Sequence, residues 1–259
     1  MNSITVVDLG RMAYHPALEL QRALVRSRLN GALEEDLLLL VEHDPVVTLG
    51  RGTRSSSLPL APAQLQRLGF EVVEVERGGD VTVHAPGQLV GYPILDLERF
   101  KPDLHWYLRQ LEGSLIGALD RLGVSARQNP GLTGVWVANR KIASIGIHVK
   151  RWVTLHGFAL NVTTNLSLFD AVVPCGIPDV IMTSVVKEVE VGRRRSKTVE
   201  DVEDVEDVED VEGGIWGRTR DAVIAGFGHV FDADMVPGNL EDLMRLQEVS
   251  NPGPMTTES

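Results

Sequence analysis

The feature that most constrains the fold is a group of three β-rich runs that follow one another in the middle of the chain. Residues 134–138 and 141–149 are joined by Asn139-Arg140, a turn pair of the kind that closes a hairpin, and residues 152–162 form the third run. Strands joined by such short turns pair antiparallel, because a parallel connection needs a much longer crossover. The sequence therefore predicts antiparallel hairpins at the centre of the sheet.

The remaining periodicity adds helices and further short strands. Apolar residues recur at helical spacing in four segments, and five short apolar or β-branched runs bounded by turn residues indicate strands. The expected helices span residues 16–29, 61–68, 103–122 and 215–231, and the expected strands span residues 37–41, 46–49, 72–75, 80–84 and 89–95. Pro93 has no N–H to donate, so it is expected at a sheet edge or a strand end. This mixed order predicts an α+β fold, with helices packed on one mixed, largely antiparallel sheet, and not a doubly wound fold.

Length and composition are those of a well-packed protein of the cytoplasm. The chain has 259 residues, 43% of them apolar, which is enough for a sizeable core. One cysteine cannot form an internal disulfide, and no stretch has the roughly 18 apolar residues of a membrane helix. The N-terminal residues also lack the basic and apolar regions of a secretion signal. We therefore predict a cytoplasmic protein that does not enter a membrane.

An acidic repeat carries most of the net charge. Nine of the thirteen residues from Glu200 to Glu212 are Asp or Glu, and without them the net charge of −11 falls to −2. The repeat is expected to form a solvated loop, and the basic residues 193–197 are expected to join it in an exposed excursion. The predicted organisation is a single domain over residues 1–248, with a low-complexity insertion at about 196–213 and a disordered tail over 249–259. Because the basic segment has no interleaved aromatic residues, nucleic-acid binding is not expected.

The only cysteine, Cys175, lies between Pro174 and Gly176, with a second proline at Pro178. A lone cysteine is most often a small buried apolar residue, and that alternative competes with a catalytic one. Prolines and glycine favour a loop, where catalytic groups concentrate. A thiol with an ordinary pKa near 8.5 is only slightly ionised at neutral pH, so a nucleophilic role for Cys175 requires a neighbouring cation or base.

Lys141 is the first candidate for that partner. It begins an apolar strand after a turn, and small residues follow it; taken alone, however, a turn lysine is more often solvated. His84 and His156, each at a strand and glycine junction, are rival candidates. No metal-ligand spacing occurs, so no metal is expected.

A second candidate site is the glycine-containing segment from Arg77 to Gln88. Its glycines allow backbone groups to approach a ligand closely, although Gly-Gly between charged residues is also an ordinary tight turn. The segment matches neither common nucleotide-binding glycine motif. No cofactor is therefore expected.

Taken together, four motifs resemble the lipoyl(octanoyl) transferases, relatives of the lipoate and biotin protein ligases. They are Arg77-Gly78-Gly79-Asp80-x-Thr82-x-His84-x-Pro86-Gly87-Gln88, Arg140-Lys141-Ile142-Ala143-Ser144-Ile145-Gly146, His156-Gly157-Phe158-Ala159-Leu160-Asn161-Val162, and Pro174-Cys175-Gly176-Ile177 followed by Thr183-Ser184. The resemblance covers residues 37–186 and implies the catalytic-domain fold of the biotin and lipoate protein ligases.

The resemblance also implies an activity and a set of site residues. The enzyme would take an octanoyl group from octanoyl-acyl carrier protein and place it on a lysine of lipoyl domains, in oxoacid dehydrogenase E2 subunits and the glycine cleavage H protein. Cys175 would carry the octanoyl thioester, and Lys141 would lower its pKa and transfer protons. The implied acyl-binding residues are Arg77, Gly78, Gly79, Asp80, Val81, Thr82, Val83, His84, Ser144, Ile145, Gly146, Gly157, Phe158 and Ala159, whose backbone amides are candidates for an oxyanion hole. Family precedent implies a monomer.

Two other functions remain open from the sequence. An ATP-dependent lipoate protein ligase would share the fold and the lysine, and an inactive acyl-binding protein would keep the pocket without the chemistry. One residue departs from the family motif: Ala85 stands where glycine is usual, and it would be strained if its φ were positive.

Overall fold

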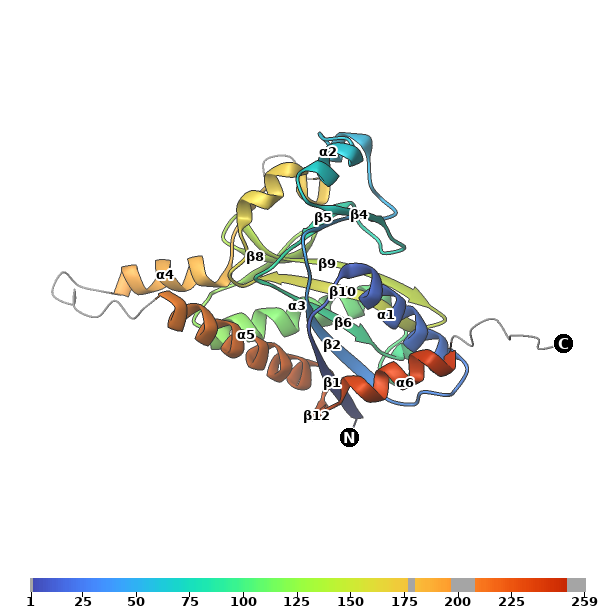
Figure 1. Ribbon diagram of the computed structural model, residues 1–259. Helices are drawn as coiled ribbons and strands as arrows, with labels where there is room; N and C mark the ends of the chain where they lie inside the picture. The colour runs from blue at the N-terminus through green and yellow to red at the C-terminus, as the bar shows by residue number, and fades with distance from the viewer. Residues whose placement is uncertain (1, 177–179, 197–207, 251–259) are drawn as a thin grey trace.

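The predicted central strands lie side by side in a large mixed sheet, seen in the computed structural model of Figure 1. The structure describes residues 2–176, 180–196 and 208–250, and the side chains of residues 175, 193–196, 208–213 and 247–250 lie outside that description. Within the described residues, the strand order of this sheet is β12-β1-β2-β6-β10-β9-β8-β7, and β11 pairs with β9.

Both modes of pairing occur in this sheet. The strands are β1 (Asn2–Arg11), β2 (Asp36–Glu42), β6 (Gln88–Ile94), β7 (Arg127–Asn129), β8 (Leu132–Val137), β9 (Arg140–Lys150), β10 (Val153–Asn161), β11 (Ile181–Met182) and β12 (Ala233–Pro237). Strand β1 runs parallel to β2 and β12, and β11 runs parallel to β9, whereas each successive pair along the path β2-β6-β10-β9-β8-β7 is antiparallel. The predicted α+β class and the central hairpin are therefore confirmed.

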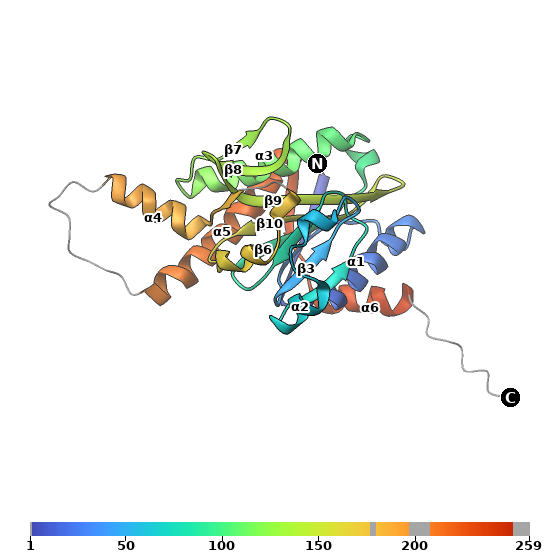
Figure 2. The same ribbon diagram turned by 90° about the horizontal axis from the view of Figure 1, so that it is seen from above.

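Helices cover both faces of the sheet. Helices α1 (Tyr14–Leu29) and α6 (Leu240–Ser250) pack together on one face, and α3 (Leu104–Arg121) and α5 (Val208–Phe231) pack on the other (Figures 1 and 2). Their apolar sides enclose the two largest hydrophobic clusters. The start and end predicted for α3 are confirmed: the Asp103 carboxylate accepts a 3.0 Å hydrogen bond from the Trp106 N–H, and Gly123 ends the helix with φ +75°.

A second, smaller sheet stands apart from the first, so the prediction of one sheet was wrong. It consists of β4 (Glu71–Glu74), β3 (Val46–Leu49) and β5 (Val81–His84), in that order, and α2 (Pro62–Arg67) lies beside it (Figure 1). Its apolar side buries Val47, Val81 and Val83 against Leu65 and Phe169. Residues 43–45, between β2 and β3, carry the chain from one sheet to the other.

Strand β6, which contains Pro93, is an interior strand, so the alternative that placed this proline at a sheet edge was wrong. Pro93 is paired with Leu38 of β2 at the penultimate position of β6, which agrees with a strand end. The Thr154 side chain bridges the irregular end of the strand, donating to the Pro93 carbonyl oxygen (2.7 Å) and accepting from the Leu95 N–H (2.8 Å). A side chain thus replaces backbone pairing that the proline interrupts.

The last part of the acidic repeat is helical. Helix α5 begins at Val208, within the repeat, and α4 (Val185–Ser196) extends through Arg193, Arg194 and Arg195. The loop prediction was wrong for residues 208–212, which continue a helix whose other end packs on the body of the protein. Residues 197–207 lie outside the described residues, as do residues 251–259 of the predicted tail; α6 extends to Ser250.

Candidate active site

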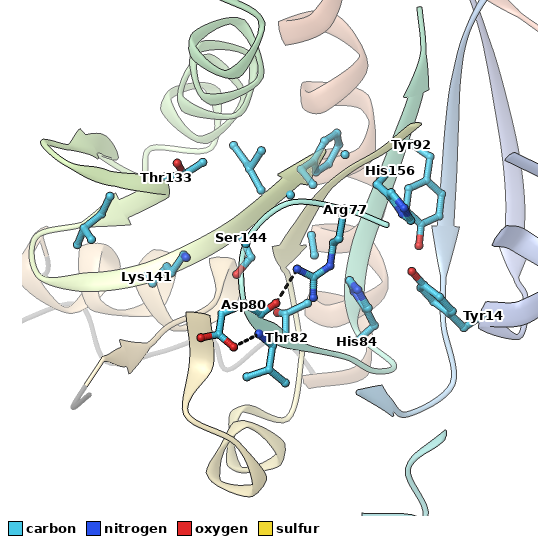
Figure 3. Close-up of a pocket in the computed structure, with 18 of the residues that line it drawn as sticks. Tyr14, Arg77, Asp80, Thr82, His84, Tyr92, Thr133, Lys141, Ser144 and His156 are labelled. Carbon is cyan, nitrogen blue, oxygen red and sulfur yellow. Dashed lines mark hydrogen bonds between the residues drawn. The ribbon is translucent and has the colours of Figure 1, made fainter. Parts of the chain in front are cut away.

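A cavity of about 210 Å³ lies between the β4–β5 loop and strands β9 and β10 (Figure 3). It brings together most of the residues that the resemblance implied, from three separate segments of the chain. These are Arg77, Gly79, Asp80, Val81, Thr82, His84, Lys141, Ser144, Ile145, Gly146, Gly157, Phe158 and Ala159. The cavity is also lined by Tyr14, Tyr92, Gly131, Leu132, Thr133 and His156.

Two residues of the predicted set, Gly78 and Val83, do not line the cavity. Val83 is fully buried in the core of the small sheet. Gly78 donates its N–H to the Ile147 carbonyl oxygen (2.8 Å) and ties the loop to the end of β9. Both residues pack next to segments that line the cavity.

Glycines let the backbone segments around the cavity approach closely. A Cβ on Gly157 would collide with the Gly91 carbonyl oxygen and lie 2.6 Å from Pro93 Cδ. A Cβ on Gly146 would lie 3.0 Å from Arg77 Cδ and 3.1 Å from the Gly78 carbonyl oxygen. Gly157 therefore allows β10 to pack closely on β6, and Gly146 allows β9 to pack closely on the β4–β5 loop.

Arg77 holds the loop in shape. Its guanidinium donates to the Asp80 carbonyl oxygen (2.7 Å) and to both the carbonyl and hydroxyl oxygens of Thr48 on β3 (2.8 Å each). The side chain is buried, with 7% of its surface exposed. A buried guanidinium satisfied by backbone oxygens stabilises one loop conformation, so Arg77 shapes the wall of the cavity.

Asp80 links the loop to the segment that contains Cys175. Its carboxylate accepts hydrogen bonds from the Ser57 hydroxyl (2.7 Å) and from the Val81 N–H (2.7 Å). Gly176, with φ +64°, packs so closely on this carboxylate that a Cβ there would collide with it. The 3₁₀ helix η4 (Pro174–Gly176) therefore lies directly against the residue that lines the cavity.

Lys141 is buried, and the alternative of a solvated turn lysine was wrong. Only 2% of its surface is exposed, and it lines the cavity near Ser144 (Figure 3). Its Nζ lies 5.6 Å from the ring centroid of Trp136. Its aliphatic stem crosses Gly134 of β8, where a Cβ would lie 2.7 Å from Lys141 Cε. The glycine makes room for a lysine to reach the cavity from a strand end.

The chain returns to Lys141 soon after Cys175. Met182 of β11 pairs with Lys141 in parallel, and the Thr183 N–H donates to the Lys141 carbonyl oxygen (2.9 Å). The Cys175 side chain lies outside the described residues, but its backbone in η4 is held at one end by the Gly176–Asp80 contact and is followed by the return to Lys141.

A cluster of tyrosines and histidines forms the other end of the cavity. Tyr14 stacks on His84 at 5.7 Å between ring centroids, and the His43 Nε2 lies 2.7 Å from the Tyr92 hydroxyl. The two tyrosine hydroxyl groups point toward one another in Figure 3. Burial lowers the pKa of His43 to about 4 and that of His84 to about 3, so both rings are neutral at neutral pH. The sequence carried no signal for Tyr14 and Tyr92, which have the pattern of ordinary core residues.

His156, a rival of Lys141 in the sequence, lies at the same end. Its φ is +61°, uncommon for a residue other than glycine, and its Nε2 lies 3.7 Å from a Glu76 carboxylate oxygen. Burial lowers the pKa of His156 and the carboxylate opposes that shift. Lys141 and His156 therefore occupy opposite ends of the cavity, and only Lys141 lies beside the returning cysteine segment.

The buried histidines predict a loss of stability in acid. A histidine whose pKa falls from 6.5 to about 4 on folding destabilises the folded protein as the pH drops below 6.5, because the unfolded state binds the proton more tightly. At pH 5 this costs about 2 kcal/mol for His43 alone. Urea unfolding at pH 7 and pH 5 should show this difference, and His43→Gln should reduce it. His229→Gln, at an exposed position, should leave it unchanged; an equal effect of both variants would contradict the assignment.

Ala85 is not strained. The backbone φ of Ala85 is not positive, and its side chain is fully buried in the core of the small sheet. Gly87, two residues later, has the positive φ of +82°. The motif needs glycine at position 87, so alanine at position 85 leaves its geometry intact.

Among the residues described, no group of three or more His, Cys, Asp or Glu side chains could hold a metal ion. Over the same residues, no helix has the length and apolar character needed to cross a membrane.

Comparison with known proteins places these features in a family. Residues 13–206 match the family described as Lipoyl protein ligase A/B catalytic domain. An octanoyltransferase of Nostoc sp. is 49% identical over 178 residues, which cover 69% of this chain and 79% of that protein. Octanoyltransferases of Solibacter usitatus (48% identical; 75% of this chain, 90% of that protein) and Synechococcus elongatus (50%; 70% and 77%) are similarly related.

Solved structures share the fold. A crystal structure of lipoate-protein ligase A bound with ATP superimposes with a TM-score of 0.71 at 18% identity, covering 100% of this chain and 97% of that chain. A bipartite lipoate protein ligase from Thermoplasma acidophilum gives a TM-score of 0.64 at 19% identity, covering 100% and 96%. The fold of the lipoate protein ligase catalytic domain is therefore confirmed. With its matching family domain and its close octanoyltransferase relatives, the chain belongs to the lipoyl protein ligase A/B catalytic-domain family and is an acyltransferase.

Proposed function

We propose that this enzyme transfers an octanoyl group from octanoyl-acyl carrier protein to a lysine of lipoyl domains, through a thioester on Cys175. The observation that carries the proposal is the position of Lys141, buried at one end of the cavity and hydrogen-bonded through its backbone to the segment that follows Cys175. The relatives named octanoyltransferase support the acyl group.

In the first half of the reaction, the Cys175 thiolate attacks the carbonyl carbon of the donor thioester. A carbon–sulfur bond forms, the tetrahedral oxyanion collapses, and the bond to the carrier sulfur breaks. The proton from Cys175 passes through Lys141 to the departing carrier thiol. Because one thioester replaces another, this step needs no ATP.

In the second half, the amino group of the acceptor lysine attacks octanoyl-Cys175. A carbon–nitrogen bond forms and the carbon–sulfur bond breaks, which regenerates the Cys175 thiolate. The amine proton goes to Lys141, a buried side chain at the reacting end of the cavity. Amide formation from a thioester is downhill, so the second half drives the overall transfer.

The cavity suits an acyl chain. Ile145, Phe158 and Ala159 give it apolar walls, and each buried methylene contributes about 0.8 kcal/mol to binding. The Tyr14 and Tyr92 end closes it against longer chains. Lipoyl domains are proposed as acceptors on the likeness to the octanoyltransferases and to an archaeal lipoate protein ligase that is described together with its E2 lipoyl domain.

The proposal predicts an acyl-enzyme that forms without ATP. Incubation with octanoyl-acyl carrier protein alone should increase the intact mass of the protein by one octanoyl group, and peptide mapping should locate it on Cys175. Adding an unmodified lipoyl domain should then remove the adduct and add the same mass to the domain.

The same experiment distinguishes the proposed transferase from an ATP-dependent ligase and from an inactive acyl-binding protein. Free octanoate with ATP in place of the carrier donor should give no adduct and no modified lipoyl domain. Modification that depends on ATP would identify a ligase, and no modification under either condition would identify an acyl-binding protein; both results would contradict the proposal.

A further inference from the structure

A buried carboxylate lies on the far side of β8 from the cavity. Glu112 of α3 is 0% exposed, and its Oε1 accepts a hydrogen bond from the Gly134 N–H (3.0 Å). Its Oε2 accepts from Arg109 Nη1 at 2.6 Å, one turn earlier on the same helix. The carboxylate is thus fixed by two donors, one of which belongs to the strand beneath Lys141.

Gly134 of β8 contacts both this carboxylate and the Lys141 side chain. With φ +126° and no side chain, it lets the lysine stem lie directly on the strand: an added Cβ would be 2.7 Å from Lys141 Cε and 3.3 Å from Nζ. The N–H of this same glycine points to Glu112. The carboxylate of Glu112 and the side chain of Lys141 therefore both lie against the same glycine of β8.

Glu112 and Lys141 are both buried, so water screens the interaction between their charges only weakly. Burial raises the pKa of Glu112, while the Gly134 N–H and the positive charges of Arg109 and Lys141 oppose the shift. Arg109 is a weaker partner than its distance implies, since 44% of its side chain is exposed and water screens it. Only 2% of Lys141 is exposed, so its interaction with Glu112 is screened far less.

We propose that Glu112 is the counter-charge of Lys141, a positioning residue that keeps the lysine protonated in the resting enzyme and holds β8 against it. A negative charge close to an amine stabilises the ammonium form and raises the pH at which the proton is lost.

The consequence for catalysis rests on the proposed function. A protonated Lys141 stabilises the Cys175 thiolate that attacks the donor. After acylation Lys141 has passed its proton to the carrier thiol, and it must remain unprotonated until it accepts one from the acceptor amine. Glu112 would therefore favour the first half-reaction and limit the second at low pH.

Other charged groups surround Lys141 and remain in every variant compared below. Asp80 and Arg77 line the opposite wall of the cavity, and Arg140 forms a bidentate pair with Glu188 of α4 at the adjoining position of β9. Cys175 follows on η4. Because these groups are unchanged, a change in the titration of Lys141 on substitution of Glu112 is due to the loss of the Glu112 charge.

The direct test is the titration of Lys141 in the intact protein. The chain has five lysines, so NMR of protein labelled with ¹³C-lysine gives few Cε signals, and Lys141→Met identifies the signal of Lys141 by its loss. Glu112→Gln keeps the shape and the acceptor for the Gly134 N–H but removes the charge. We expect the Lys141 midpoint to fall by about one pH unit or more.

Two further variants control this result. Asp120→Asn removes an exposed carboxylate from the same helix and should leave the Lys141 midpoint unchanged. Arg109→Gln removes the competing cation and should raise the midpoint, which tests the pairing even if Glu112→Gln folds poorly. An unchanged or higher midpoint in folded Glu112→Gln, or a lower one in Arg109→Gln, would overturn the pairing.

A kinetic readout separates this inference from the proposed function. In single-turnover transfer from octanoyl-enzyme to a lipoyl domain, the acidic limb of the pH–rate profile should move to lower pH in Glu112→Gln, by the same amount as the Lys141 midpoint. A shifted midpoint with an unshifted profile supports the pairing and contradicts the role of Lys141 as proton acceptor.

Discussion

Cys175→Ser is expected to lower octanoyl transfer from octanoyl-acyl carrier protein to a lipoyl domain by roughly 10³-fold or more. The serine hydroxyl is close in size to the thiol but far less acidic, so a neighbouring ammonium cannot generate its anion at neutral pH. The rate is measured by the mass of the lipoyl domain in single-turnover samples, and the adduct on the enzyme should be absent.

The matched control for this variant is Ser167→Ala, at an exposed position eight residues earlier on the segment that leads to η4. It should retain near wild-type transfer. If Cys175→Ser kept more than about a tenth of the wild-type rate, transfer would not pass through a cysteine thioester, and direct attack on the carrier thioester would replace the proposed mechanism.

Lys141→Met is expected to have the second largest effect, a loss of about 10²- to 10⁴-fold in overall transfer. Methionine can occupy the space along Gly134 and beside Trp136, so the loss reports the missing charge and proton acceptor. Both half-reactions should slow, because the ammonium form assists thiolate formation and the amine form accepts the proton from the acceptor. They are followed separately, by the rate of adduct formation and by the rate of its transfer.

Lys141→Arg separates the role of the positive charge from the role of the proton acceptor. A guanidinium keeps the positive charge but does not lose its proton. Acyl-enzyme should still form, with the carrier leaving as a thiolate that water protonates, while transfer to the lipoyl domain stops. Lys187→Met, at an exposed position on α4, is the control and should leave both rates unchanged. Equal rates in Lys141→Met and wild type would remove Lys141 from the mechanism.

Elements that depend on near neighbours in the sequence were predicted well. The hairpin of β8 and β9 follows from Asn139-Arg140, and α3 follows from the Asp103 cap and the Gly123 stop, because turn and cap chemistry act within a few residues. Strands β1 and β12 and helix α6 were not predicted. They come from opposite ends of the chain, β1 pairs with β12 in parallel, and α6 packs on α1, contacts that no local pattern records.

The candidate site shows the same division. The motifs named the loop at Arg77–Asp80, Lys141 and the glycine strands, and the structure brings them to one cavity. Tyr14, Tyr92 and the segment from Gly131 to Thr133 were missed, because their sequence surroundings are those of core and turn residues. Glu112 was missed for a similar reason, since a carboxylate on an amphipathic helix is usually solvated.

The sequence by itself determined the central hairpin, the ends of α3, the α+β class and, through its motifs, the family. Tertiary structure decided that there are two sheets, that Lys141 is buried and that Glu112 and Lys141 both lie against Gly134. The physical reason is that turns, caps and motifs depend on residues close in sequence, whereas burial depends on what packs from elsewhere. A lysine after a turn is solvated or buried according to whether a glycine on the neighbouring strand leaves it room, and a helix on the sheet face supplies its counter-charge.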